Sequence, residues 1–320
     1  MKPRRYWMLA ALLLLSCSAP KQIEIALIPK GTDILFWKAV HAGGEKAGQE
    51  LGVKVLWQGP QKESDREQQI NIVQNFISRG VDAIVLAPLD ETALVRPVQA
   101  ALKRNIPVII IDSGLKGEGF SSYIATNNFA GGQLAAQKLA EMIGDKGNVI
   151  LMRFNEGSNS THEREEGFLA YLRENAPQVT ILSADQYAGV TMELALKTGQ
   201  NLLNKYSEID GIFCPNESTT FGMMRALKTV GKAGKVKLIG FDYTDPIAEA
   251  VRAREISGVI VQDPFGIGYG GVKAAVDVLN GQSVPARVET DVVFVTAENI
   301  DDPAILSVTS PDIDRWLGRQ

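Results

Sequence analysis

Four polar residues follow predicted apolar strands, at positions where binding sites are often built. They are Asp112, Asn216, Asp242 and Gln262. Carboxylates accept hydrogen bonds, and side-chain amides both donate and accept them. Sugar hydroxyls also donate and accept, so this mixture suits a small polyhydroxylated ligand. The alternative is structural, because Asp and Asn after a strand are also common helix N-caps and turn formers.

An arginine and three aromatic residues extend this candidate site. Arg164 lies near the start of a predicted helix and can donate hydrogen bonds in a fork. Phe36, Trp37 and Tyr187 follow strand ends, where flat apolar faces could pack on a sugar ring. Structural alternatives stay open. Phe36 and Trp37 could be core residues of the first helix, and Arg164 could be a solvated charge among neighbouring glutamates.

Few residues are available for metal or redox chemistry. The chain has two histidines and two cysteines, and neither His41 nor His162 has a second ligand at metal spacing. Two cysteines cannot form a disulfide framework, and Cys214, in a predicted buried strand, suits core packing. We therefore expect no metal site and no cofactor.

One glycine-rich segment matches a nucleotide-binding pattern. Residues 266–271 read Gly-Ile-Gly-Tyr-Gly-Gly, and a helix is predicted to follow at 272–279. Residues 262–265, which include a proline, separate this segment from the preceding strand. We therefore expect the glycines to serve close backbone packing at a helix start and not a cofactor.

Strands and helices alternate along the chain in two similar halves, which favours α/β layers around parallel sheets. Strands are predicted at 23–28, 53–57, 83–87, 107–111, 148–153, 179–183, 211–214, 236–241 and 258–261. Helices are predicted at 37–51, 66–79, 93–104, 163–174, 192–205 and 219–230. Right-handed crossovers bring the carboxyl ends of such strands to one edge, where ligands bind. The candidate residues from both halves fall on these edges.

Length and charge narrow the possible partners. The chain has 320 residues, enough for two domains at about 150 residues each. Its formal net charge is −4, and no basic patch or arginine-rich run is present. Nucleic acid is therefore not expected as a partner.

The N-terminus has the pattern of a secretion signal. Lys2, Arg4 and Arg5 precede an apolar run at 7–15, about half the length of a membrane-spanning helix. The run ends in Leu-Leu-Ser-Cys, which resembles a bacterial lipobox with Cys17 as the lipidated residue. We predict a signal peptide at 1–16, and an extracytoplasmic chain, periplasmic or at the cell surface, anchored to the membrane through Cys17.

Several segments, in order, resemble the ribose-binding branch of the periplasmic sugar-binding proteins, which share a fold with LacI-type regulators. The resemblance covers nearly all of residues 22–300. The segments that carry it are Phe36-Trp37-Lys38, 82–86, 106–112, 164–168, Asn216-Glu217, 240–242 and Val261-Gln262.

This resemblance implies the type I periplasmic binding protein fold, an α/β fold of two doubly wound parallel-sheet lobes joined by a three-segment hinge. It implies a first lobe at 22–125 with 263–292, and a second lobe at 126–262 with 293–320. The crossings are expected near 125–127, 262–264 and 291–294, and closure would be a hinge motion about them.

The resemblance also assigns roles to residues. Phe36 and Trp37 become the aromatic contacts of the first lobe, and Asp112 becomes a hydroxyl acceptor there. Arg164 spans the ligand from the second lobe, and Tyr187 stands near the aromatic residue of that lobe. Asn216, Asp242 and Gln262 complete the ring of contacts.

Two departures from the ribose binders lie in the first lobe. Those proteins have an asparagine where Ala87 stands and an arginine where Ser113 stands. Loss of a bidentate donor changes recognition. We therefore expect a ligand such as a hexose, a sugar alcohol or a furanosyl signal molecule, with Ser113 in the roomier part of the pocket.

The resulting hypothesis is a monomeric substrate-binding lipoprotein that delivers a sugar or polyol to an ABC transporter permease. The alternative is the ligand-binding component of a chemosensory or signalling receptor. A LacI-type regulator would need a helix-turn-helix before the first strand, and a signal segment stands there instead. An enzyme is not expected, although Asp112 and Asp242 could be imagined as the acid–base pair of a glycosidase.

Overall fold

Strands that are apolar on both faces build the first lobe. The computed structural model describes residues 21–318, so the predicted signal peptide 1–16 and Cys17 lie outside the described residues. The first sheet is wholly parallel. Its strands lie in the order β11 (Arg287–Thr290), β5 (Ser122–Thr126), β4 (Val108–Ile111), β3 (Ala83–Leu86), β1 (Glu24–Ile28) and β2 (Lys54–Trp57).

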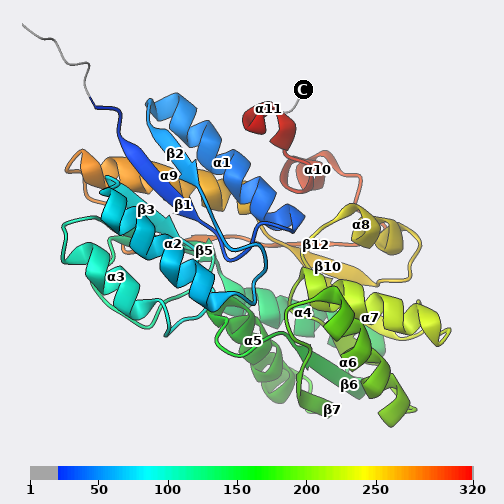
Figure 1. Cartoon of the computed structure of the whole chain (residues 1–320). Coiled ribbons are helices and arrows are strands. Elements are labelled where there is room, and N and C mark those ends of the chain that lie inside the picture. The colour runs from blue at the N-terminus through cyan, green and yellow to red at the C-terminus, as the bar shows by residue number, and fades with distance from the viewer. Residues whose placement is uncertain (1–20, 319–320) are drawn as a thin grey trace, which may run out of the picture.

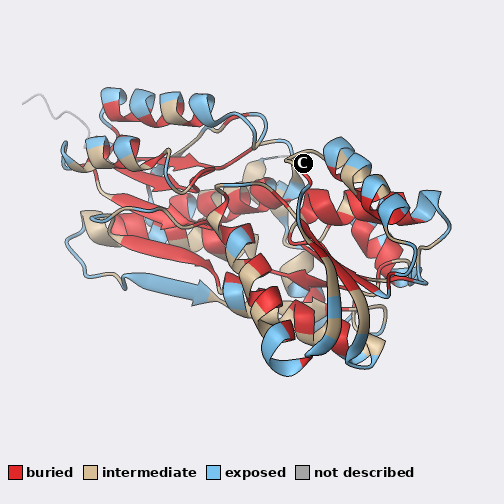
Figure 2. Cartoon of the chain, turned by 90° about the horizontal axis from the view of Figure 1, so that it is seen from below, coloured by how far each residue is buried: buried red, intermediate tan, exposed pale blue. Residues whose placement is uncertain are grey.

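Successive side chains along these strands point to opposite faces of the sheet, and each face packs against a layer of helices. In β1, Ile25 and Leu27 pack with the helices α1 (Leu35–Leu51) and α9 (Pro264–Leu279). Ala26 and Ile28 point to the opposite face, where α2 (Arg66–Arg79) and α3 (Val95–Leu102) cover them. Figure 2 shows the result, with buried strands between helices whose outer surfaces are exposed.

The second lobe repeats this plan. Its sheet runs β12 (Val293–Val295), β10 (Gly258–Val261), β9 (Lys237–Phe241), β8 (Gly211–Phe213), β6 (Lys146–Arg153) and β7 (Gln178–Tyr187), with only β12 antiparallel. One face packs on α4 (Asn128–Ile143) and α5 (Asn159–Asn175). The other packs on α6 (Met192–Lys205), α7 (Glu217–Thr229), α8 (Asp245–Arg252) and α10 (Pro303–Thr309).

The chain crosses between the two sheets three times (Figure 1). It leaves the first sheet after β5, returns through α9 after β10, and leaves again between β11 and β12. The two parallel-sheet lobes and the three-segment connection predicted from the resemblance are thus confirmed. Within residues 21–318, every helix is too short or too polar to traverse a bilayer.

The segment 293–320 was predicted to belong wholly to the second lobe, and the structure corrects this for its last helix. β12 joins the second sheet, and Ile305 of α10 is part of the second-lobe core. The helix α11 (Ile313–Leu317) instead packs against α1 of the first lobe (Figure 1). There the Lys46 ammonium lies 5.9 Å from the Trp316 ring. Apolar surface on α1 holds this short helix, a feature that sequence periodicity over five residues cannot encode.

The glycine-rich segment lies inside α9 and not before it, because Pro264 starts the helix and Asp263 caps it by accepting from the Gly266 N–H at 2.7 Å. Gly268 meets α1 backbone to backbone: a Cβ there would lie 2.0 Å from the Val40 carbonyl oxygen. Gly43 of α1 is placed the same way against the Phe265 carbonyl. The glycines therefore allow two helices of the first lobe to approach closely, as predicted.

We expect Gly268→Ala to destabilise the protein, because the added methyl group has no space between α1 and α9. The cost should be about 1–3 kcal/mol, as in other overpacked cores. Gly270→Ala is the matched control in the same helix, since its Cβ would meet nothing closer than 3.6 Å. The control should leave stability unchanged or raise it by up to about 1 kcal/mol through helix propensity. Urea denaturation of both variants tests this, and equal midpoints would contradict it.

Candidate functional site

A cavity lies between the two lobes, at the carboxyl ends of both sheets. It contains about 330 Å³ of space unoccupied by protein atoms, part of it open to solvent. The residues that line it are Lys30, Ile34, Phe36, Trp37, Glu63, Asp112, Phe154, Ser158, Ser160, Thr161, Arg164, Asn216, Asp242 and Gln262.

Two aspartates occupy equivalent positions in the two lobes. Asp112 directly follows β4 and Asp242 directly follows β9, with φ of 62° and 72°. Each backbone N–H is held by the neighbouring strand, at 3.0 Å from the Ile124 oxygen and 2.8 Å from the Ile260 oxygen. Residues other than glycine adopt this left-handed conformation rarely, and it concentrates at functional sites. The strands therefore aim both carboxylates into the cavity at the expense of some backbone strain.

Arg164 is the hub of the second lobe's polar groups. Its guanidinium donates to Asn128 Oδ1 at 2.9 Å, to the Pro215 carbonyl at 2.9 Å and to Gln262 Oε1 at 3.0 Å. Its underside stacks on the Phe241 ring at 3.7 Å. Burial lowers the pKa of Arg164 from its usual value. A guanidinium has five N–H groups, so two stay available to a ligand.

Gln262 connects this site to the segments that cross between the lobes. It donates to Asp242 Oδ1 at 2.7 Å and accepts from the Thr126 hydroxyl at 2.7 Å. The Thr126 hydroxyl lies 3.4 Å from that of Thr290. Thr126, Gln262 and Thr290 stand at the three crossings, so the ligand-facing network and the connection between the lobes share their hydrogen bonds.

Asp242 is also held from the far side, since the Glu217 backbone N–H donates to its Oδ2 at 3.0 Å. Burial, the largest influence, raises the pKa of Asp242. Both of its oxygens thus have a fixed donor, and a ligand would meet the remaining lone pairs.

Lys30 supplies a cation in the first lobe. Its ammonium lies 2.8 Å from Asp112 Oδ2, and both side chains are about 95% buried. The same ammonium donates to the Ser160 hydroxyl of the second lobe at 3.1 Å. Lys30 follows β1 almost directly, so the strand-end argument could have found it, but the sequence interpretation passed over it.

Direct contacts between the lobes hold them in a closed arrangement around the cavity. The Ser160 N–H donates to the Ser113 hydroxyl at 3.1 Å, and the Gly114 N–H donates to Asn159 Oδ1 at 2.9 Å. All these contacts involve the loop before α5 and its first turn. Ser113, predicted as a site residue, is fully buried and holds this closed arrangement; it is not among the residues that line the cavity.

The predicted first-lobe aromatics both reach the cavity. Phe36 and Trp37 pack edge to face, with ring centroids 4.8 Å apart. The Trp37 indole donates to Glu63 Oε1 at 2.7 Å, and burial raises the pKa of Glu63. Phe36 and Trp37 thus belong to the core and also line the cavity, and their contact with a ligand stays a prediction.

Tyr187 does not reach the cavity. It ends the edge strand β7, is 42% exposed, and lies with its ring 5.8 Å from the Arg153 guanidinium. The parallel register pairs it with Arg153, the last residue of β6. The chain then turns inward after β6, so the second-lobe aromatic at the cavity is Phe154. Sequence spacing alone could not tell which of these two strand ends faces the first lobe.

Asn216 has two roles. It lines the cavity, and its Oδ1 accepts from the Thr219 N–H at 3.2 Å as the N-cap of α7. The structural alternative for this residue is therefore also correct. Glu63 lies in a turn, Ser158 is the N-cap residue of α5, and Ser160 lies in the first turn of that helix. No periodic pattern marks these positions, so sequence reasoning missed them.

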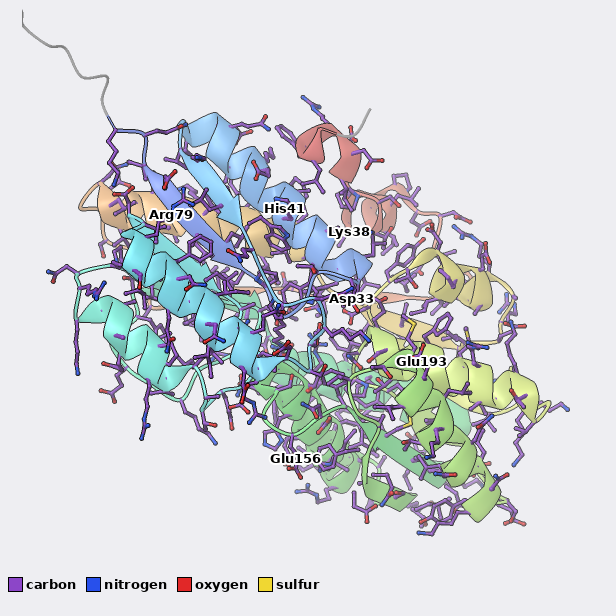
Figure 3. All side chains as sticks on the ribbon, viewed as in Figure 1. Asp33, Lys38, His41, Arg79, Glu156 and Glu193 are labelled. Atoms are coloured by element: carbon purple, nitrogen blue, oxygen red, sulfur yellow. The ribbon has the colours of Figure 1, made fainter. Side chains whose placement is uncertain are left out.

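The cavity continues outward into a larger opening, with about 820 Å³ of unoccupied space that includes open solvent. Asp33 and Glu193 line it from the two lobes (Figure 3). Ile34, Glu63 and Asn216 line both spaces, so the opening adjoins the cavity.

Glu217 is a buried carboxyl behind the site. It is 4% exposed, and its Oε2 lacks a hydrogen-bond partner among the described residues. Burial, together with the nearby Asp242 carboxylate, raises the pKa of Glu217 to about 8. The folded protein therefore holds a proton that the unfolded chain releases near pH 4.5, the usual pKa of a glutamate.

Because the folded-state pKa is raised, this group favours folding at low pH and loses that contribution as the pH rises from about 4.5 to 8. The slope is about 1.4 kcal/mol per pH unit. We expect Glu217→Gln to become increasingly stable relative to the wild type between pH 5 and 8. Chemical denaturation at several pH values measures this. Glu193→Gln is the control, because Glu193 is exposed. Parallel plots of unfolding free energy against pH for the wild type and Glu217→Gln would contradict the expectation.

Comparison with known proteins finds relatives that share one family. Residues 25–283 match the family described as periplasmic binding protein domain. The ribose import binding protein of Haemophilus influenzae is 31% identical over 284 residues, which cover 89% of this chain and 95% of that protein. The D-allose-binding periplasmic protein of Escherichia coli is 27% identical over 281 residues, 85% of this chain and 90% of that protein.

Solved structures that resemble this chain belong to the same class of binding proteins. A carbohydrate transporter solute-binding protein from Agrobacterium radiobacter, in complex with D-arabinose, has a TM-score of 0.87 at 34% identity and covers 91% of this chain and 100% of that one. An ABC transporter solute-binding protein from Agrobacterium vitis with bound D-fucose has a TM-score of 0.84 at 36% identity, covering 89% and 99%. These relatives are binding proteins and not enzymes. The chain therefore belongs to the periplasmic binding proteins of the ribose-binding type, with the type I fold.

Proposed function

We propose that this protein is the extracytoplasmic binding component of an ABC-type sugar importer, which closes its lobes around one sugar or sugar-like polyol. The observation that carries the proposal is the interlobe cavity, where fixed acceptors, fixed donors and aromatic rings from both lobes converge. The relatives named for ribose and D-allose, and the structures with D-arabinose and D-fucose, support the ligand class.

The donors and acceptors are distributed between the lobes. Asp112 with Lys30 offers an acceptor and a donor from the first lobe, and Arg164 with Asp242 offers the same pair from the second. Vicinal hydroxyls can accept from the cations and donate to the carboxylates at once. Phe36, Trp37 and Phe154 supply apolar surface for the carbon skeleton of the ligand.

We further propose that Cys17 carries the lipid that anchors the protein outside the cytoplasmic membrane, and that the protein acts as a monomer. The short apolar run at 7–15 and the Leu-Leu-Ser-Cys sequence support the anchor. A signalling receptor would recognise the same closed lobes as a permease, so the ligand site described here serves either partner.

A thermal-shift screen of residues 18–320 with pentoses, hexoses, polyols and amino acids tests the ligand class. A ligand at about 100 times its dissociation constant stabilises a protein by about 2.7 kcal/mol. For a protein of this size the melting temperature should rise by several degrees. We expect a shift with a sugar or polyol. A response confined to amino acids, or to none of the carbohydrates, would overturn the proposal.

Asp112→Asn tests the first-lobe acceptor. Asparagine tolerates the left-handed backbone that Asp112 adopts, so the fold should persist. Loss of a charged acceptor should raise the dissociation constant of the sugar about 10- to 100-fold. Asp145→Asn is the matched control, because Asp145 is exposed and has a φ of 57°. Isothermal titration of both variants measures the effect, and an unchanged affinity in Asp112→Asn would exclude this residue from the site.

A further inference from the structure

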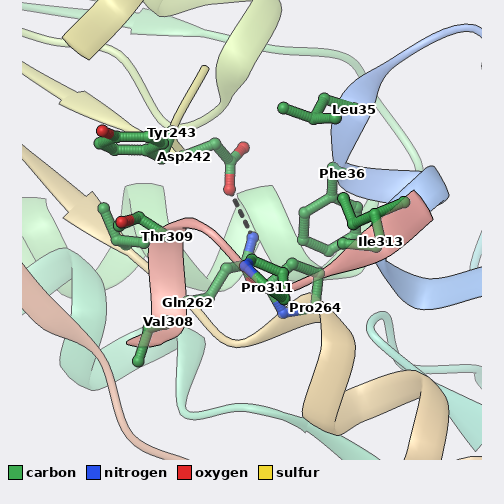
Figure 4. Close-up of a pocket in the computed structure, with 12 residues that line it drawn as sticks. Leu35, Phe36, Asp242, Tyr243, Gln262, Pro264, Val308, Thr309, Pro311 and Ile313 are labelled. Carbon is green, nitrogen blue, oxygen red and sulfur yellow. Dashed lines mark hydrogen bonds between the residues drawn. The ribbon is translucent and has the colours of Figure 1, made fainter. Parts of the chain in front are cut away.

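A second cavity adjoins the first on the side of the crossing segments (Figure 4). It contains about 420 Å³ of space unoccupied by protein atoms, part of it open to solvent. Phe36, Asp242 and Gln262 line both cavities. Gln262 and Asp242, which are joined by a hydrogen bond of 2.7 Å, therefore border both spaces. A ligand in the first cavity lies against the residues that open onto the second.

The C-terminal segment forms the outer wall of this second cavity. Val308 of α10 packs with the second-lobe core, and Ile313 of α11 lies near the start of α1 in the first lobe. Figure 4 shows Val308 and Ile313 on opposite sides of the space, with Pro311 between the two helices. Both lobes and the C-terminal segment thus contribute, so the cavity is complete only in the closed arrangement.

The walls of the second cavity are mainly apolar. Apart from Asp242, Gln262 and Thr309, they consist of aliphatic, proline and aromatic side chains, among them Leu35, Val261 and Tyr243. Apolar spaces of this kind hold water poorly and take up apolar groups. The first cavity differs, because charged and amide groups surround it. Two adjoining spaces of opposite character suit a ligand with one hydroxylated part and one apolar part.

We propose that the preferred ligand is a sugar or polyol that carries a small apolar substituent, such as the methyl group of a deoxy sugar or the alkyl group of a short alkyl glycoside, seated in this second cavity. This inference rests on the proposed sugar-binding function and specifies its substrate class. The hydroxylated part occupies the first cavity, and Phe36 contacts both parts of the ligand.

Matched pairs of ligands test the proposal by isothermal titration on residues 18–320. The pairs are D-galactose with D-fucose, D-ribose with 5-deoxy-D-ribose, and D-ribose, D-allose and D-arabinose with their methyl and ethyl glycosides. In the glycosides, each additional buried methyl or methylene group should tighten binding about fourfold. The deoxy sugars add no carbon, and they should bind more tightly because they place no hydroxyl against the apolar wall. We expect at least one apolar member to bind more tightly than its parent by that factor.

Val308→Phe locates the substituent. The larger side chain should fill the second cavity without entering the first, which Val308 does not line. Binding of the parent sugar should stay unchanged, and the advantage of the apolar member should disappear. Leu306→Phe is the matched control, because Leu306 lies in the same helix, is 36% exposed and lines neither cavity. Melting temperatures of both variants verify that they fold.

Three outcomes would overturn the proposal, and they are distinguishable. If parent sugars bind and no apolar member binds more tightly, the substrate class is wrong while the sugar-binding function stands. If the advantage survives in Val308→Phe, the substituent lies elsewhere. If no carbohydrate binds at all, the proposed function fails and this inference fails with it.

Discussion

The buried guanidinium of Arg164 is the interaction on which the site depends. An arginine that is 2% exposed must find partners for its charge and its N–H groups, because an unpaired buried charge costs several kcal/mol. Its partners come from α4, from the residue before the α7 cap, and from the residue after β10. Satisfying one side chain therefore fixes the relative positions of three elements. It also fixes Gln262, through which Asp242 and the crossing segments are connected.

The duplicated topology explains why two carboxylates converge. Each sheet is parallel through its centre, so its strands end at one edge, and in both lobes that edge faces the other lobe. Asp112 and Asp242 follow strands of corresponding position and share a left-handed backbone and a hydrogen bond to the next strand. The strain at these two residues is maintained by β4 and β9, whose residues are all buried except Lys237. A site built on such rigid elements is preorganised for its ligand.

Sequence patterns predicted the cavity residues that follow strand ends and missed those that lie on loops. Asp112, Asp242 and Gln262 line the cavity because each directly follows a buried strand, and Asn216 lines it three residues after the end of β8. Glu63 and Phe154 reach the cavity from loops, and their positions depend on how the lobes meet, which periodicity does not describe. Tyr187 shows the converse. Its strand was predicted, but as the edge strand of the second sheet it places Tyr187 at a separate hollow, which Glu91 and Lys116 of the first lobe also line.

The two cavities place opposite requirements on the two ends of a ligand. Closure buries the Lys30 and Asp112 pair and leaves two N–H groups of Arg164 without a protein partner among the described residues. Because closure also removes water, a ligand must replace those lost hydrogen bonds, and an analogue without the matching hydroxyl leaves buried polar groups unpaired. In the second cavity we expect the penalty to reverse along the wall formed by Val308, Pro311 and Ile313, since a hydroxyl against those side chains would itself lack partners. Under the proposed function, selectivity would therefore be set at both ends by the cost of an unsatisfied polar group.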